Sequence, residues 1–254
     1  MSARALVLVY HAIEPGPAPL CVEPSLFREH LDVIAEAPVR AVGLDQLADQ
    51  LEAGGPVEPS VAITFDDGFA SMVEQAAPML AERDLPATVF CVAGHLGGLS
   101  DWATAPASAP RLRLAGAPEL RDLAAGGVEV GSHGMSHLPL SRADEALERE
   151  IVESRASLEE ATGAAVHWFA HPYGSLPGAR GRALIERTYS GAVTSENRAA
   201  DAGSDRWRIP RVDVHYLRRP ALLRRTLEGG GSYLAVRRAG ARVRRLIRSD
   251  FVPG

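Results

Sequence analysis

Eight short apolar runs with strand-like composition recur along the chain, and helical patterns fill most of the intervals between them. The runs are Ala5–Tyr10, Val39–Val42, Val61–Phe65, Ala87–Val92, Val128–Val130, Val166–Phe169, Gly191–Val193 and Arg208–Val212. Alternation of this kind is typical of parallel βαβ units. The number of repeats predicts an α/β fold, closed into a barrel or a barrel-like sheet, in a single domain.

Helical spacing of apolar residues predicts the elements between the strands. It begins at Ser25 and recurs over Leu44–Leu51, Met72–Arg83 and Pro118–Ala125. A capping-box pattern at Ser141 predicts a further helix that runs to about Thr162.

Composition is that of an ordinary globular chain. The 254 residues are 46% hydrophobic, enough for a sizeable core, and the formal net charge of −5 gives no reason to expect a nucleic-acid partner. Cys21 and Cys91 match no metal or redox spacing, so we expect two free thiols. With no signal-peptide pattern and no apolar stretch near the roughly 20 residues of a membrane span, the sequence predicts a cytoplasmic protein.

Two polar clusters directly follow predicted strands. Thr64–Gly68 contains the adjacent carboxylates Asp66 and Asp67, and Gly131–His137 contains His133 and His137. In α/β folds the carboxyl ends of the strands converge on one mouth. Adjacent carboxylates repel each other, and a cation or a shared proton relieves the repulsion. Two imidazoles four residues apart can ligate one metal ion where small residues let the chain curl.

Two histidines and one carboxylate form a ligand set of catalytic zinc sites, and zinc is the default metal for such a set. Such sites polarise a carbonyl group and lower the pKa of bound water towards ~7. The ordinary structural interpretations are an Asp-Asp-Gly turn and core or surface histidines. A third cluster, Phe169–Gly174, also follows a strand and is by itself typical of an X-Pro turn.

Taken together and in this order, the three clusters resemble the motifs of the polysaccharide deacetylases, carbohydrate esterase family 4, whose domain is also called the NodB-homology domain. The resemblance runs from about residue 5 to residue 215 and implies a distorted (β/α) barrel. It implies that Asp66 is the catalytic base and that Asp67, His133 and His137 bind a divalent metal ion, by default Zn²⁺. Pro172 and Tyr173 match the third motif, in which the tyrosine backbone N–H helps to bind the oxyanion.

The opening Val9–Ile13, Val-Tyr-His-Ala-Ile, resembles the subgroup that includes poly-N-acetylglucosamine deacetylases. The usual third motif begins with an arginine that holds the catalytic base, whereas this chain has Ala170 there, and Arg211 is a hypothetical substitute. Two candidates for the general acid stay open. His11 matches the subgroup motif, and His215 lies about where the common family pattern has its histidine; we favour His11.

The resemblance implies a metal-dependent hydrolase that removes N-acetyl groups from an amino-sugar substrate, a polysaccharide, oligosaccharide or lipid-linked glycan, and releases acetate. One alternative is a C–N hydrolase of a small N-acyl metabolite or sugar nucleotide. The other is a catalytically silent carbohydrate-binding protein. The long segment Gly94–Gly116 is expected to form a loop over the site. Its Trp102 either stacks on a sugar ring, as a substrate-binding residue beside Pro172 and Tyr173, or caps the loop.

Basic residues are concentrated at the C-terminus, where ten arginines stand against two acidic residues from Arg218 onward. We therefore expect a deacetylase-like catalytic domain over residues 1–217 and a basic helical tail over residues 218–254. Tyr233–Arg248 has two open interpretations. It is either a helix that packs by its apolar positions or a basic amphipathic helix in peripheral contact with an anionic membrane, which would suit a lipid-linked substrate.

Overall fold

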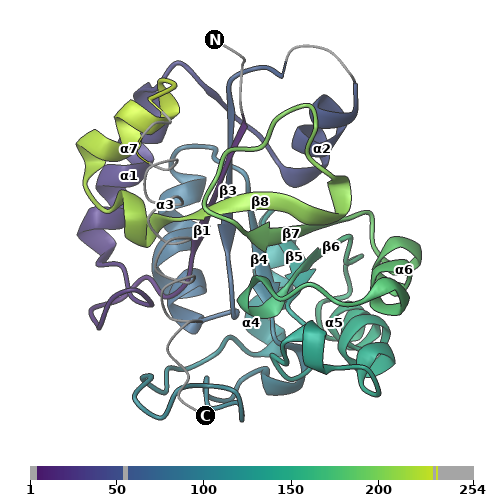
Figure 1. Cartoon of the computed structure of the whole chain (residues 1–254). Coiled ribbons are helices and arrows are strands. Elements are labelled where there is room, and N and C mark those ends of the chain that lie inside the picture. The colour runs from purple at the N-terminus through teal and green to yellow at the C-terminus, as the bar shows by residue number, and fades with distance from the viewer. Residues whose placement is uncertain (1–4, 54–56, 231–232, 234–254) are drawn as a thin grey trace, which may run out of the picture.

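The computed structural model describes residues 5–53, 57–230 and 233, and its centre is a closed parallel barrel (Figure 1). Around the ring the strands run β1, β8, β7, β6, β5, β4 and β3, and β3 pairs back with β1. The strands are β1 Ala5–Tyr10, β2 Arg40–Ala41, β3 Ser60–Phe65, β4 Ala87–Cys91, β5 Glu129–Ser132, β6 Trp168–Ala170, β7 Gly191–Ser195 and β8 Ile209–Asp213. All eight coincide with predicted runs, and the α/β-barrel prediction is confirmed.

The barrel is distorted because its strand pairs differ in length. β1 pairs with β3 over six residues, from Ala5 opposite Ser60 to Tyr10 opposite Phe65. By contrast, β5 and β6 share a single matched pair, Ser132 opposite Phe169. The short β2 stays outside the ring and pairs only with the first two residues of β3.

Helices surround the barrel. They are α1 Pro24–Glu36, α2 Leu44–Glu52, α3 Ala77–Ala81, α4 Ala117–Ala125, α5 Ser154–Thr162, α6 Ala179–Thr188 and α7 Pro220–Leu227. In Figure 1, α1, α3 and α7 lie together on one side of the barrel and α5 and α6 on another. Two π-helical turns, Met72–Ala76 and Arg149–Glu153, lead into α3 and α5. The helix α6 was not predicted, because most of its residues are polar or small and only a few are buried.

The predicted helix start at Ser141 is wrong. Leu140–Arg142 forms a 3₁₀ turn, and continuous helix begins only at Leu147. The Ser141 hydroxyl accepts a hydrogen bond from the Ser175 hydroxyl at 2.8 Å. The Ser141 backbone N–H donates to the same Ser175 oxygen at 3.2 Å. Ser141 therefore joins two loops and does not cap a helix.

Strand residues alternate between two cores, as the period of two in a β-strand requires. Leu6, Leu8 and Tyr10 of β1 belong to the core between the barrel and the outer helices. Ala5 and Val7 belong to a second cluster, which also contains strand residues of β4, β6, β7 and β8 and the apolar face of α2. This inner cluster fills the barrel below its mouth, so the polar residues gather at the carboxyl ends of the strands.

Helix α7 packs on the outer core. Leu223 and Leu227 are part of that core, and Arg224 forms a 2.7 Å ion pair with Glu36 of α1. The predicted tail helix falls largely on residues 234–254, which lie outside the described part of the chain. The proposed boundary after residue 217 stays a prediction. Within the described residues, no helix combines the length and the apolar character needed to cross a membrane.

Packing in the inner core leaves no room for a side chain at Gly191. A Cβ atom at this position would overlap the ring of the fully buried Trp168. We expect Gly191→Ala to lower the free energy of unfolding by about 1–3 kcal/mol, as overpacking does in other cores. Urea denaturation measures this. Gly203→Ala is the control, because its Cβ would meet nothing closer than 3.6 Å; equal stability of the two variants would contradict the packing described here.

Candidate active site

The residues of the three polar clusters converge at the mouth of the barrel. A pocket of about 290 Å³ opens there. The polar side chains that line it include His11, Asp66, Asp67, His133, His137, Tyr173 and Asp213. They follow or end strands β1, β3, β5, β6 and β8, and the convergence expected of a parallel barrel therefore holds.

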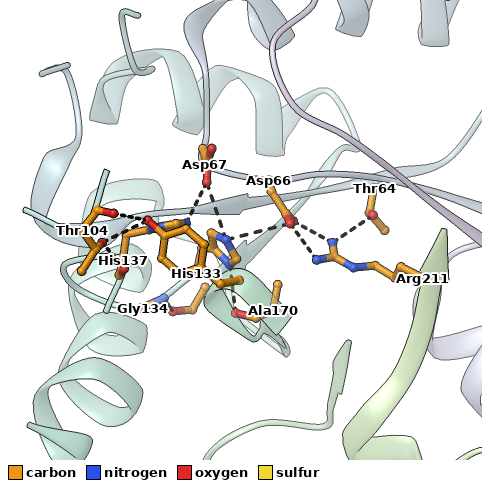
Figure 2. A network of polar contacts seen from close by, with 11 residues as sticks. Thr64, Asp66, Asp67, Thr104, His133, Gly134, His137, Ala170 and Arg211 are labelled. Carbon is orange, nitrogen blue, oxygen red and sulfur yellow. Dashed lines mark hydrogen bonds and ion pairs between the residues drawn. The ribbon is translucent and has the colours of Figure 1, made fainter. Parts of the chain in front are cut away.

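Asp67 and the two histidines form a compact buried group (Figure 2). Oδ1 of Asp67 lies 3.2 Å from Nε2 of His137 and 3.6 Å from Nε2 of His133. One ligand atom from each residue lies within 4.8 Å of the others. The chain achieves this with left-handed backbone at Asp67, at Gly68 and at His137, whose φ values are 70°, 75° and 57°.

The hydrogen bonds of this group fit a divalent cation. Nδ1 of His133 lies 2.9 Å from the carbonyl oxygen of Ala170. Since a carbonyl only accepts, Nδ1 carries the proton, and Nε2 presents its lone pair towards the carboxylates. Oδ1 of Asp67 is buried and accepts no hydrogen bond from the described residues. A buried acceptor facing imidazole nitrogens is the arrangement that a metal ion satisfies.

Burial and charge set the protonation of the group. Burial lowers the pKa of His133 to about 4, which keeps its imidazole neutral and able to ligate a metal. Burial alone would raise the pKa of the Asp67 carboxyl, but the neighbouring histidines outweigh it and lower that pKa. His133 and Asp67 are therefore ready to bind a cation at neutral pH without first losing a proton.

Asp66 is held by a buried guanidinium. Arg211 of β8, fully buried, donates to both carboxylate oxygens, at 2.6 and 2.7 Å, and to Thr64 Oγ1 at 3.2 Å. Burial alone would raise the pKa of the Asp66 carboxyl, but Arg211 holds it well below its usual range. Oδ2 of Asp66 also lies 3.9 Å from Nε2 of His133. Arg211 therefore makes the ion pair with Asp66 that the hypothesis of a substitute for the missing motif arginine requires.

The predicted loop over the site is present, and it is tied to the histidine loop. Trp102 is only 7% exposed, and its ring stacks on His137 with centroids 4.4 Å apart. Thr104 donates from its hydroxyl to the His137 carbonyl at 3.0 Å. Tyr173 donates from its hydroxyl to Thr104 at 3.1 Å, and its ring edge also contacts His137. Trp102 is thus largely buried and still lines the pocket, so stacking on a sugar ring and capping the loop both stay predictions. Thr104 gave no sequence signal, because it lies in an irregular segment.

The two histidines considered as general acid lie in different places. His11 lines the pocket, and its charge is among the causes that lower the pKa values of Asp66 and Asp67. His215 lies in the turn after β8, where its backbone N–H donates to Asp213 at 2.8 Å, and it is not among the pocket-lining residues. The structure therefore brings His11, but not His215, together with the carboxylates. Pro172 is buried beside Tyr173, whose backbone has a φ of 57°.

The Arg211–Asp66 pair predicts a stability effect. We expect Arg211→Met to lower the free energy of unfolding by about 3–5 kcal/mol, because a buried carboxylate loses its partner. The loss should shrink as pH falls from 7 towards 4, since protonation neutralises the unpaired Asp66 carboxyl. Urea denaturation across this pH range measures it. Exposed Arg187→Met is the matched control and should change stability by less than about 0.5 kcal/mol; a loss independent of pH would contradict the assignment.

Comparisons with known proteins point to one family. The family model described as polysaccharide deacetylase matches residues 53–189 of this chain. YxkH of Bacillus subtilis (strain 168) is 23% identical over 217 residues, which are 84% of this chain and 72% of YxkH. A chitooligosaccharide deacetylase of Rhizobium leguminosarum bv. trifolii is 31% identical over 112 residues, 43% of this chain and 44% of the relative.

Two solved structures share the fold. Streptococcus pyogenes deacetylase PplD superposes with a TM-score of 0.73 at 22% identity, over 89% of this chain and 99% of PplD. IcaB from Ammonifex degensii superposes with a TM-score of 0.71 at 24% identity, over 89% of this chain and 96% of IcaB. With the matched family model covering more than half of its residues, the chain belongs to the polysaccharide deacetylase family.

Proposed function

We propose that this protein is a metal-dependent carbohydrate N-deacetylase, which hydrolyses the N-acetyl group of an amino sugar and releases acetate. The observation that carries the proposal is the placement of two carboxylates with distinct partners in one pocket. Asp66 is paired with Arg211, and Asp67 faces His133 and His137. The name of the chitooligosaccharide deacetylase among the relatives supports the same substrate class.

Asp67, His133 and His137 would hold the metal ion, by default Zn²⁺. When bound, this ion would supply Lewis acidity to the acetyl carbonyl and lower the pKa of the attacking water. Side chains and backbone of this chain would supply the general base, the oxyanion donor and the general acid.

Asp66 acts as the general base in this proposal. Its carboxylate stays ionised, since Arg211 holds its pKa low, and it lies next to the metal-binding group, where it can accept the proton of the attacking water. The same pairing fixes the orientation of the carboxylate. The backbone N–H of Tyr173 would donate to the developing oxyanion. His11, which also lines the pocket, would protonate the leaving amine.

Acetate release from a panel of N-acetyl sugars tests the function. The panel runs from chitooligosaccharides to a sugar nucleotide, and the protein is loaded with Zn²⁺. We expect release that falls about 10²–10⁴-fold in Asp66→Asn, because the variant lacks the general base. Exposed Asp122→Asn, on α4, is the matched control and should keep full activity. No release by any member, with metal shown to be bound, would favour a non-sugar amide substrate or a silent binding protein.

The pH dependence of kcat/KM tests whether His11 or His215 is the general acid. The reaction needs an ionised base and a protonated acid, so kcat/KM should follow a bell-shaped pH profile. We expect His11→Gln to lower kcat about 10²–10⁴-fold and to abolish the basic limb of the profile, because the leaving amine loses its proton donor. His215→Gln should keep the wild-type kcat and the basic limb of the profile. The reverse pattern would assign the general acid to His215.

A further inference from the structure

The loop between the two metal-binding histidines rests on a buried carboxylate from a different element. Glu150 is fully buried. Its Oε2 accepts hydrogen bonds from the backbone N–H groups of Met135 and Ser136, at 2.9 and 3.0 Å. Its Oε1 accepts the Ser136 hydroxyl at 2.6 Å. All three donors are neutral groups of the loop that carries His133 and His137.

The backbone of the loop needs this support. Gly134 has a φ of 82°, and a Cβ atom there would lie 2.8 Å from Oε2 of Glu150. The loop thus passes directly against the carboxylate, and it ends in left-handed backbone at His137. Non-glycine residues in that region cost free energy and persist only where the surroundings hold them. A buried carboxylate is also costly unless several donors satisfy it, and here the loop itself supplies them.

A local break in helix geometry brings Glu150 to the loop. It lies in the π-helical turn Arg149–Glu153, which leads into α5. Turns of this kind occur often at functional sites. The Ser154 hydroxyl donates to the Glu150 carbonyl at 2.7 Å and lies 2.9 Å from the Ser132 hydroxyl. Oγ of Ser132 in turn accepts the Gly134 N–H at 3.2 Å. The π-helical turn therefore contacts the loop directly through Glu150, and Ser154, which follows the turn, is linked to the loop through Ser132.

The two histidines differ in how far they depend on the loop. His133 is oriented by its Nδ1 hydrogen bond to the Ala170 carbonyl. Nδ1 of His137 is buried and has no hydrogen-bond partner among the described residues. Its ring is placed by contacts with Trp102 and Tyr173 and by the backbone that precedes it. Residues 134–136 therefore contribute directly to the position of His137.

We infer that Glu150 is a positioning residue of the metal site, which holds the His133–His137 loop in its ligating shape and so determines the affinity for the divalent cation. The inference rests on the metal site of the proposed function. Glu150 itself bonds to the loop and not to the group of Asp67 and the histidines. Its effect passes through the backbone of Met135 and Ser136.

The test is the affinity of the metal-free full-length protein for Zn²⁺, measured by competition with a chromophoric chelator. We expect Glu150→Gln to bind Zn²⁺ about 10–100-fold more weakly than the wild type, as removal of outer-shell partners does at other metal sites. The amide is neutral and has one acceptor oxygen in place of two, so it loses the charge-assisted strength of these bonds and holds the loop more weakly. Exposed Glu153→Gln, in the same π-helical turn, should bind like the wild type. Glu150→Asp should recover part of the loss.

Histidine NMR of the metal-free protein gives a second readout. We expect the ring signals of His137 to shift or broaden in Glu150→Gln, while those of His133 stay in place. Folded Glu150→Gln with wild-type Zn²⁺ affinity and an unchanged His137 signal would overturn the inference. If Glu150→Gln fails to fold, Ser136→Ala removes one of the three bonds and should still weaken Zn²⁺ binding several-fold; unchanged binding would then overturn the inference.

The outcomes separate this inference from the proposed function. Zn²⁺ binding that depends on Glu150, without acetate release from any N-acetyl sugar, would support the inference and contradict the deacetylase. A wild-type protein that binds no Zn²⁺ would contradict the proposed metal site, and the His137 signal would then decide alone whether Glu150 positions the loop.

Discussion

The buried ion pair between Arg211 and Asp66 is the constraint on which the mouth of the barrel depends. It joins β8 to the end of β3. Through Thr64, which also donates to the Leu8 carbonyl at 2.7 Å, it reaches β1. Arg211 and Thr64 thus link β1, β3 and β8 through side-chain hydrogen bonds. A guanidinium in a fully buried place is tolerated only with such a partner, so the pair fixes the geometry of the site as well as its charge.

Much of the fold could be predicted from the sequence, because strands and helices have different periods. All eight strands were predicted in place, since each is a short apolar run bounded by polar or turn residues. The helix α6 was not predicted, because few of its residues are buried and its apolar pattern is therefore weak. The start of the helix before α5 was placed too early, at Ser141, because a Ser followed by acidic residues is a pattern that loops also use. Local sequence does not show that Ser175, far along the chain, binds that hydroxyl.

Some residues of the candidate site could be predicted from the sequence, and others could not. Motifs could identify Asp66, Asp67, His133 and His137, because these residues form two short clusters in the sequence and each cluster follows a strand. Arg211 could be suggested only from the gap left by Ala170, since its partner lies 145 positions away along the chain. Nothing in the sequence marked Thr104 or Glu150. Their roles depend on which backbone groups a loop leaves unpaired, and that depends on the tertiary structure.

The charges of the site explain why its two carboxylates would take different roles. Asp66 is neutralised by the full positive charge of Arg211, so it gains little from a further cation and remains free to accept a proton. Asp67 faces imidazoles, and burial keeps that of His133 neutral while the Ala170 carbonyl fixes its tautomer. Asp67 has no guanidinium beside it of the kind that compensates Asp66. A divalent ion held there would compensate its charge and place positive charge beside the point where the oxyanion would develop. The arginine that compensates Asp66 would therefore also direct a metal ion to Asp67.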